Sequence, residues 1–386
     1  MTRTALRVAL AGLVALPGAA RPAAAQGRMP HQFIFALGGA ALGLGATALY
    51  SGRNYSRSLG WCSSVTCVGI WTTSLGTLLG YLIGHEQDEK YSLRYRLAPP
   101  VELANRSRNL RTRATGLDLG AGIVAVSGDD GVELVSAQPR LDYLGQRARG
   151  LRDILDVGVR PDTARLLIGT GTGLYLYDVA ADSAGLRTLA SATGAVAVRE
   201  GRVAAAAGGA IHVGRLVGDS VAWASDTVVL TRRVTDLKWQ NDSVLWALAE
   251  TRLTAYVVAG DSAAHEVGAV DLTGLSRRLT ITDSLAVIAA GAGGVFVVHV
   301  ADPALPRIVS HWDKARYVYD VALWQGRIYA AAGPEGMYVL SFDGEHLQPI
   351  GVARDMGFVA ALAAGDALYV LDRTGGVLRR IEAATP

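Results

Sequence analysis

The sequence predicts an all-β fold, a seven-bladed β-propeller of four-stranded blades, preceded by a glycine-rich transmembrane α-helical hairpin. Three observations predict it. The stretch from Leu285 to Leu340 divides into short apolar runs separated by turns rich in glycine or proline. The same pattern recurs at a nearly constant interval, and two uncharged, glycine-containing segments lie ahead of it. Short strands bounded by turn residues at such spacing are typical of a propeller.

The interval between repeats sets the number of blades. We measure it at the residue before the apolar run that follows each glycine-rich turn: Gly131, Gly173, Ala210, Arg252, Gly294, Gly336 and Gly376. The successive gaps are 42, 37, 42, 42, 42 and 40 residues. Propeller blades take about 40–50 residues, so these units predict seven blades. Because one four-stranded sheet cannot bury both of its faces, we expect the blades to stack around a common axis.

The clearest repeat combines four short motifs. They are Asp302-Pro303 with Pro306, Asp320-Val321-Ala322, Tyr329-Ala330-Ala331 and Gly336-Met337-Tyr338-Val339. In these motifs the chain resembles the LVIVD-repeat β-propellers of bacterial envelope and surface proteins, over about residues 115–386. The last three repeats match best, whereas Ala210 and Arg252 stand where the family has glycine. The resemblance implies the propeller architecture and says almost nothing about function.

The first 25 residues are expected to be a signal peptide. Arg3 and Arg7 precede a short apolar core, and Ala23-Ala24-Ala25 forms a cleavage site. An uncleaved membrane anchor is the alternative, but Pro17 interrupts the core. Removing residues 1–25 removes three of the 37 basic residues and none of the 34 acidic ones, which leaves 34 of each. This balance argues against nucleic acid as a partner, since such binding needs a retained basic face.

Residues 31–84 are expected to form a glycine-zipper membrane hairpin. Two segments, Phe33–Tyr50 and Val65–Gly84, carry no charge. Both are long enough to cross a hydrocarbon core of about 30 Å. Each contains glycines four residues apart, which let helix backbones approach closely in lipid. The alternative is a soluble glycine- and alanine-rich hairpin that packs on the propeller.

The charges around this hairpin predict its orientation. The connection between the segments carries Arg53 and Arg57, whereas the far flank carries Glu86, Asp88 and Glu89. Basic residues favour the cytoplasmic side of a membrane, so both ends of the hairpin are predicted outside it. We therefore expect an exported, membrane-anchored protein with its propeller in the periplasm or on the cell surface.

Cys62 and Cys67 are the two cysteines of the chain. Two ligands fall short of the four that a structural zinc site needs. Export favours a disulfide between them, whereas the hairpin topology places them on the reducing side or in the membrane. Both redox states therefore stay open.

Residues 85–114 link the hairpin to the propeller of residues 115–386 and contain six arginines. These favour either contact with anionic lipid headgroups or a solvated linker. The same segment is expected to close the ring. The last repeat has room for three strands before Pro386, and an open blade would leave a long unpaired edge, which proteins avoid. The spacing before Asp320 places the missing strand near Val101–Arg106, with Ser92–Leu97 as the alternative.

Asp156, Asp236 and Asp320 fall at the same place in their repeats, and Arg278 takes that place in another. Because inner strands line the central channel, these residues are expected to ring one of its mouths. Three carboxylates are weak candidates for a Ca²⁺ site, since hard cations take oxygen ligands. A carboxylate at the start of a strand also accepts hydrogen bonds from nearby backbone N–H groups. We favour this structural interpretation.

The sequence contains no recognisable catalytic motif. The seven histidines lack H-x-x-x-H spacing, and no G-x-S-x-G is present. Residues 169–173 form a glycine-threonine hairpin turn rather than a phosphate loop, because no lysine follows. Trp312 and Trp324 flank strand ends and are candidates for an exposed platform that binds a sugar or a peptide. We predict no enzymatic activity, no cofactor and no catalytic residue.

The sequence therefore predicts a non-catalytic, membrane-tethered, extracytoplasmic β-propeller that acts as a protein-interaction or assembly scaffold in the bacterial envelope. Its expected partners are the membrane and another envelope protein. The alternatives are a propeller enzyme of lactonase or quinoprotein type and a carbohydrate-binding module. Convergent metal ligands or an acid pair at the channel mouth would favour the enzyme, and exposed tryptophans the carbohydrate-binding module. Fold alone does not decide among them.

Overall fold

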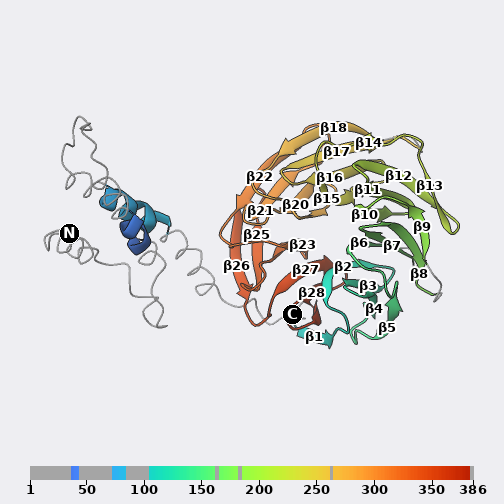
Figure 1. The fold of residues 1–386 in the computed structure, drawn as a ribbon, viewed down its shortest axis with the longest axis horizontal. Helices are drawn as coiled ribbons and strands as arrows, with labels where there is room; N and C mark the ends of the chain where they lie inside the picture. Colours follow the sequence, from blue (N-terminus) through green and yellow to red (C-terminus); the bar gives the residue numbers. More distant parts are fainter. Residues whose placement is uncertain are drawn as a thin grey trace, which may run out of the picture. The chain divides into compact units, whose positions relative to one another are not determined.

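The computed structural model describes residues 36–42, 72–83, 104–160, 165–180, 185–260 and 264–382. The chain divides into two compact units, Met1–Arg96 and Leu97–Pro386. The expected signal peptide and the cysteines Cys62 and Cys67 lie outside the described residues. The second unit is a ring of antiparallel sheets around a central axis, as Figure 1 shows.

Seven sheets make up the ring, and the strands of each follow one another from the axis outward. Blade 1 contains β2 (Ala114–Gly120), β3 (Ile123–Gly128), β4 (Gly131–Ser136) and β5 (Tyr143–Arg147). Blade 2 contains β6 (Ile154–Val159), β7 (Arg165–Thr170), β8 (Gly173–Asp178) and β9 (Leu186–Leu189). Blade 3 contains β10 (Thr193–Arg199), β11 (Arg202–Ala207), β12 (Ala210–Val217) and an outer strand in two pieces, β13 (Ser220–Trp223) and β14 (Val228–Val229). Blade 4 contains β15 (Val234–Trp239), β16 (Val244–Ala249), β17 (Arg252–Val258) and β18 (Ala264–Asp271).

The remaining blades follow the same order. Blade 5 contains β19 (Arg278–Ile281), β20 (Leu285–Ala289), β21 (Val295–His299) and β22 (Arg307–Trp312). Blade 6 contains β23 (Asp320–Trp324), β24 (Arg327–Ala331), β25 (Met337–Phe342) and β26 (Leu347–Ala353). Blade 7 contains β27 (Val359–Ala364), β28 (Leu368–Asp372), β29 (Val377–Glu382) and β1 (Ala104–Asn109). The prediction of a seven-bladed propeller is confirmed, and the residues that measured the interval start or directly precede the third strand of each blade.

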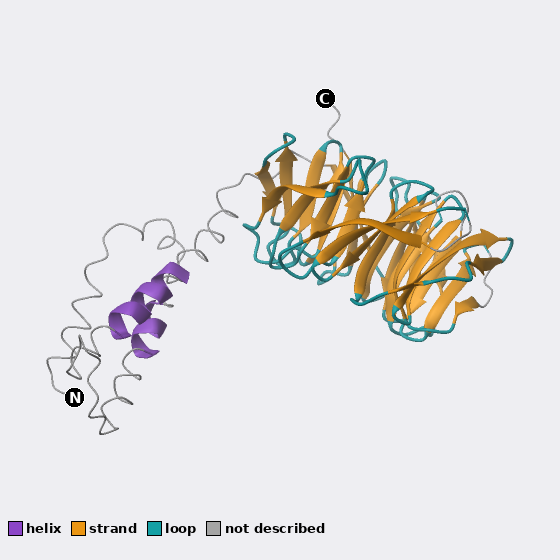
Figure 2. Ribbon diagram, turned by 90° about the horizontal axis from the view of Figure 1, so that it is seen from above, coloured by secondary structure: helices purple, strands orange, loops and turns teal. Residues whose placement is uncertain are grey.

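The ring has two faces, which Figure 2 shows nearly edge-on with the loops collected along them. Each inner strand contacts the inner strand of the next blade, and the last of them, β27, contacts the first, β2. We call the face on which the inner strands begin the N-face. It also carries the hairpins between second and third strands. The opposite face, on which the inner strands end, is the C-face.

Strand β1 closes the ring from before the first repeat. It pairs antiparallel with β29, from Ala104 opposite Glu382 to Asn109 opposite Val377. The strand thus starts three residues later than the spacing before Asp320 suggested. The reason is a shorter connection, since residues 110–113 lead from β1 to β2 whereas residues 313–319 lead from β22 to β23.

Apolar side chains pack between neighbouring blades. Trp246 of β16 is fully buried among side chains of blades 4 and 5, including Leu279 and Phe296. Its indole N–H donates to Gln240 Oε1 at 2.9 Å. The Gln240 amide in turn donates to the backbone oxygens of Asp283 at 2.6 Å and Val300 at 3.1 Å in blade 5. Because both faces of an inner sheet are covered in this way, its strands form near-continuous apolar runs.

The repeats that depart from the family pattern have a different hairpin. Gly294 and Gly336 have φ of 82° and 91°, and an added Cβ would overlap a backbone oxygen of the outer strand. These positions therefore require glycine. In blades 3 and 4 a two-residue hairpin precedes Ala210 and Arg252, and neither has a positive φ. In these two blades the position therefore does not require glycine.

Two helical segments belong to the first unit, residues 36–42 and 72–83. They meet at Gly39 and Gly76, where a Cβ on either residue would overlap the backbone of the other. Gly80 is buried, whereas the aliphatic side chains of residues 75, 78, 79, 82 and 83 are each 51–56% exposed. Among the described residues, no helix combines the length and the apolar character needed to cross a bilayer.

The closing strand predicts the effect of an N-terminal truncation. A chain that begins at Leu110 lacks β1 and leaves β29 as an unpaired edge, whereas a chain that begins at His85 keeps both strands. We expect the shorter chain to melt about 10 °C lower. For a domain of this size, each kcal/mol lost from the free energy of unfolding lowers the melting temperature by about 2–4 °C. Differential scanning calorimetry of the two chains measures the difference, and equal melting temperatures would contradict this closure.

Candidate functional site: the charged channel

The inner strands share one position that faces the channel. A β-bulge near the start of β6, β15 and three other inner strands precedes this position. We call it the channel slot, and in blades 1 to 7 it is occupied by Gly116, Asp156, Ala195, Asp236, Arg278, Asp320 and Ala361. The sequence spacing therefore placed the three predicted aspartates and Arg278 correctly at equivalent positions.

Each slot aspartate accepts a hydrogen bond from the next blade. The Oδ2 atoms of Asp156, Asp236 and Asp320 accept from the backbone N–H groups of Val196, Leu279 and Leu362, at 2.9, 2.8 and 2.8 Å. In each case the donor directly follows the slot of its own blade. The structural interpretation predicted backbone N–H donors in the adjoining turn, but these donors belong to the neighbouring inner strand.

The other carboxylate oxygens are engaged as well. Oδ1 of Asp236 and of Asp320 accept from the N–H of the following residue, at 2.9 and 2.8 Å. Oδ1 of Asp156 lies 3.0 Å from Nη1 of Arg278. All three aspartates are buried, with exposed fractions of 1–8%. Buried carboxylates need such donors, because an unpaired buried charge is costly.

Asp118 is a fourth channel aspartate, which the spacing argument missed. It lies two residues beyond the slot of β2, and its Oδ2 accepts from the N–H of Val159 in blade 2 at 2.7 Å. It performs the same linking role one step further along the strand. In the sequence it stands out only as a single aspartate in an apolar strand. Its distance from Gly131, the residue that measures the repeat interval in this blade, differs from that of the slot aspartates in theirs.

The other seams between blades use different side chains. Arg199 Nη1 donates to the oxygen of Gln240 at 3.1 Å, which links blades 3 and 4. Thr280 Oγ1 donates to the oxygen of Val321 at 2.7 Å, which links blades 5 and 6. Blade 7 is linked to blade 1 by the Tyr369 hydroxyl and Arg380 Nε, which donate to the oxygen of Ala137 at 2.6 and 3.2 Å. Every seam in the ring therefore has a side-chain-to-backbone hydrogen bond.

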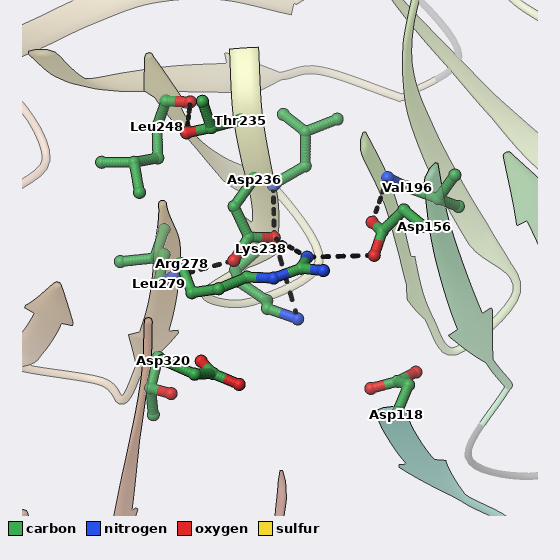
Figure 3. Close-up of polar contacts among 12 residues, drawn as sticks. Asp118, Asp156, Val196, Thr235, Asp236, Lys238, Leu248, Arg278, Leu279 and Asp320 are labelled. Carbon is green, nitrogen blue, oxygen red and sulfur yellow. Dashed lines mark hydrogen bonds and ion pairs between the residues drawn. The ribbon is translucent and has the colours of Figure 1, made fainter. Parts of the chain in front are cut away.

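Arg278 is the cationic centre of the channel. Its guanidinium lies between the slot aspartates of two other blades, with Nη1 3.0 Å from Asp156 Oδ1 and 3.9 Å from Asp236 Oδ1. Nζ of Lys238 lies 4.0 Å from the same Asp236 oxygen. Figure 3 shows these groups with Asp118 and Asp320 on the facing walls. Two cations thus offset part of the charge of four carboxylates.

The proton affinities reflect this arrangement. Burial raises the pKa of Asp320 to about 6, against the opposing effect of Arg278 and of two backbone N–H groups. Burial also raises the pKa of Asp118 and of Asp236, while Lys238 opposes both shifts. Asp236 raises the pKa of Lys238. Burial alone would lower the pKa of Arg278, but Asp156 and Asp236 outweigh it and raise that pKa.

The weak metal candidates are therefore bonded within the protein. Within the ranges that the structure describes, no group of three or more His, Cys, Asp or Glu side chains is arranged to hold a metal ion. The oxygens that the sequence offered for Ca²⁺ accept backbone N–H groups or lie beside Arg278. What the arrangement does chemically is to join blades and balance charge.

The two tryptophans proposed as a ligand platform are core side chains. Trp312 and Trp324 are each 5% exposed. Trp312 packs edge-on against Tyr338, with ring centroids 5.1 Å apart. Trp324 packs against Tyr329 within the apolar cluster of blades 6 and 7, with centroids 5.8 Å apart. Both lie at strand ends, as expected, but on the side that faces the adjoining blade.

Comparison with solved structures agrees with this architecture. A chain of the "Crystal Structure of Mitotic Checkpoint Complex" matches with a TM-score of 0.58 and 15% identity, covering 73% of this chain and 94% of that one. The WD40 β-propeller domain of Doa1 matches with a TM-score of 0.56 and 13% identity, covering 73% and 98%. The chain has the seven-bladed β-propeller fold. The computationally designed Ika8 protein also matches, with a TM-score of 0.50, 13% identity and coverage of 71% and 98%.

Comparison of the sequence adds no family. No family model matches the chain, and no curated protein matches it. The likeness to LVIVD-repeat propellers therefore stays a resemblance in its motifs. At 13–15% identity, the solved structures establish the fold alone.

The seam hydrogen bonds predict what removal of an aspartate does. Asp156→Ala, Asp236→Ala and Asp320→Ala should each lower the free energy of unfolding by about 1–3 kcal/mol, because buried donors lose their acceptor. Asp355→Ala, on the exposed N-face, is the control and should change it little. Urea unfolding measures both. Calcium and EDTA should leave the melting temperature unchanged, and a chelator-sensitive melt that disappears in Asp320→Ala would favour a metal site instead.

The raised pKa of Asp320 predicts a pH dependence. Its folded value is about 6 and its ordinary value is 3.8, so the folded state binds a proton before the unfolded state does. Protonation therefore favours folding as the pH falls through 6. We expect the free energy of unfolding to rise by about 1 kcal/mol from pH 7 to pH 5. Asp118 and Asp236 act in the same direction, so Asp320→Asn should flatten this rise without abolishing it. An unchanged slope in the variant would contradict the assignment.

Proposed function

We propose that the protein is a non-catalytic, membrane-tethered, extracytoplasmic β-propeller that acts as an interaction or assembly scaffold in a bacterial envelope. One observation carries the proposal. The ionisable groups gathered in the channel are engaged in joining blades, as Asp156, Asp236 and Asp320 each accept a backbone N–H of the next blade. The charged groups at the axis thus stabilise the ring. This supports a role in binding, through the outer surfaces of the ring.

The ring is suited to this role because its blades are mutually fixed. Side-chain hydrogen bonds cross every seam, and β1 completes blade 7 through six residue pairs with β29. A surface whose loops are held by such a frame loses little conformational entropy on binding, since they are already ordered. Loops from all seven blades meet on each face, which supports a broad binding platform.

The tether is supported by the two helical segments, whose aliphatic side chains are exposed while small residues form the contact between them. Leu75, Leu78, Leu79, Leu82 and Ile83 recur at i, i+3, i+4, i+7 and i+8 and are all exposed. The small residues Gly39 and Gly76 form the contact between the helices instead. In a water-soluble helix the aliphatic stripe faces the core, whereas in lipid small residues pack between helices. Thr77 satisfies its hydroxyl within its helix, at 2.7 Å from the oxygen of Thr73.

The tether predicts where the protein is found after deletion of the hairpin. The intact protein should remain in the membrane fraction after carbonate extraction, because its apolar stripe is buried in lipid. Deletion of Phe33–Gly84 behind the signal peptide should release a folded propeller into the periplasm or the medium. Immunoblotting of the fractions measures both. A deleted protein that still resists carbonate extraction would contradict the tether.

The scaffold role is tested on the same two proteins by chemical cross-linking in native membranes, followed by mass spectrometry. A scaffold should give one recurring envelope protein as its partner, with both the intact chain and the deleted one. Capture of no protein, together with a metal-dependent hydrolase activity that copurifies, would overturn the scaffold role and favour the enzyme.

A further inference from the structure

The loops on the two faces of the ring carry opposite net charge. The N-face connections and hairpins contain eleven Lys or Arg residues against seven Asp or Glu residues. The described C-face connections contain two basic residues, Arg140 and Arg160, against nine acidic ones. Three of the C-face acids, Asp219, Asp242 and Asp366, pair with arginines, namely Arg165, Arg199 and Arg380, at 2.5, 3.7 and 2.9 Å. The basic charge of the loops is thus concentrated on the N-face.

Most of this charge lies in one sector of the N-face. Four consecutive connections lead into blades 4 to 7, namely residues 230–233, 272–277, 313–319 and 354–358. They hold six basic residues and two acidic ones. Arg232, Arg233 and Arg277 are exposed. We call these four connections the basic sector.

An aromatic ladder runs along the same sector. The rings of Tyr317 and Tyr319 have centroids 4.6 Å apart, and those of Tyr319 and Phe358 have centroids 4.9 Å apart. The Arg277 guanidinium lies 5.6 Å from the Tyr317 ring. All three rings are partly exposed, and Leu275 beside them is 60% exposed. The ladder therefore spans two successive connections of the N-face, and Arg277 extends it to a third.

The backbone makes room for these rings. Gly333 has a φ of 57°, and a Cβ there would lie 2.6 Å from Tyr319 Cε2 and 3.1 Å from Phe358 Cζ. Gly291 has the same φ and the same relation to Tyr317, whose Cζ would lie 2.9 Å away. Larger residues would displace the rings. The ladder is thus fixed by the repeat itself, and partly exposed aromatics with arginines are the side chains that dominate protein interfaces.

We propose that the basic sector of the N-face binds an acidic, extended polypeptide segment of a partner protein that carries aromatic or aliphatic side chains. This inference rests on the proposed scaffold function and names its partner and surface. Carboxylates of the segment would pair with Arg232, Arg233 and Arg277, and its apolar side chains would pack on Leu275 and the ladder. Charge complementarity of this kind sets specificity and association rate.

A polypeptide fits the sector better than a lipid surface does. Exposed acids, among them Asp355 and Glu250, lie between the arginines. A bilayer covers the whole face and would meet these acids too, whereas a segment pairs with individual arginines. The path of the chain agrees with this. Strand β1 enters the ring at Ala104, opposite Glu382 at the C-face end of β29, so the N-face is not the side at which the chain joins the ring.

The test places a photo-cross-linker on each face of the full-length protein in its native membrane. Benzoylphenylalanine replaces Leu275 in the basic sector or, as the matched control, Leu305 on the C-face, which is 72% exposed. After irradiation the attached peptide is sequenced by mass spectrometry. We expect adducts at position 275 with a segment in which Asp and Glu outnumber Lys and Arg, and none with that segment at position 305.

Charge reversal tests the chemistry of the same adduct. Arg233→Glu with Arg277→Glu should reduce its yield about tenfold, because both paired charges become repulsive. Arg140→Glu with Arg307→Glu changes the net charge equally, away from the basic sector, and should leave the yield unchanged. Thermal melting of both variants checks that they fold.

The possible results separate the inference from the proposed function. A partner segment attached only at position 305 would overturn the inference and leave the scaffold intact. A lipid adduct at position 275, or a segment without acidic excess there, would also overturn the inference. Absence of protein adducts at both positions, together with no partner from chemical cross-linking, would overturn the scaffold as well.

Discussion

The hydrogen bond between an inner-strand side chain and the backbone of the next blade is the interaction on which the ring depends. Seven twisted sheets around an axis touch through side chains, and their strands are not paired across the seams except by short bridges. Gly291 with Val318 and Gly333 with Val359 are two such bridges. A buried N–H that faces a seam therefore needs a side-chain acceptor. An aspartate at the channel slot meets this need with one oxygen. Its second oxygen accepts an N–H of its own strand in Asp236 and Asp320, and lies beside Arg278 in Asp156.

This solution concentrates negative charge at the axis, and the rest of the channel follows from that. Four buried carboxylates within one channel raise one another's cost of ionisation. Arg278 takes the slot of blade 5 and lies between Asp156 and Asp236, so this slot, which departs from aspartate, supplies compensating charge. The departure has a local consequence, because an arginine cannot accept the N–H of blade 6. Thr280 links that seam instead, by donating to the oxygen of Val321. Burial nevertheless raises the pKa of Asp320 to about 6, although Arg278 opposes this shift.

The sequence predicted the ring well and its surface poorly, for physical reasons. Periodicity predicted seven blades and a closing strand because every blade obeys the same burial pattern. It located Asp156, Asp236 and Asp320 because they occupy the same position of the repeat, the channel slot. Asp118 was missed because it lies two residues beyond the channel slot of β2. It also links two blades, but its position does not match the spacing of the other three aspartates. Trp312 and Trp324 were expected on the surface because they flank strand ends. Exposure depends instead on which face of the sheet a side chain points to, and both tryptophans point into a seam between blades.

The separation of basic and acidic loops between the two faces could not be predicted from the sequence, for a different reason. Successive connections along the chain belong alternately to the two faces, so basic and acidic loops are interleaved in sequence and the charge totals nearly cancel. Only the topology assigns 230–233 and 272–277 to one face and 240–243 and 282–284 to the other. The result is a charge dipole along the ring axis, which orients an approaching acidic segment towards the N-face over about a Debye length, 10 Å at 0.1 M salt. The rigid seams keep that dipole fixed relative to the aromatic ladder. Long-range charge attraction and short-range apolar contact therefore act at the same place.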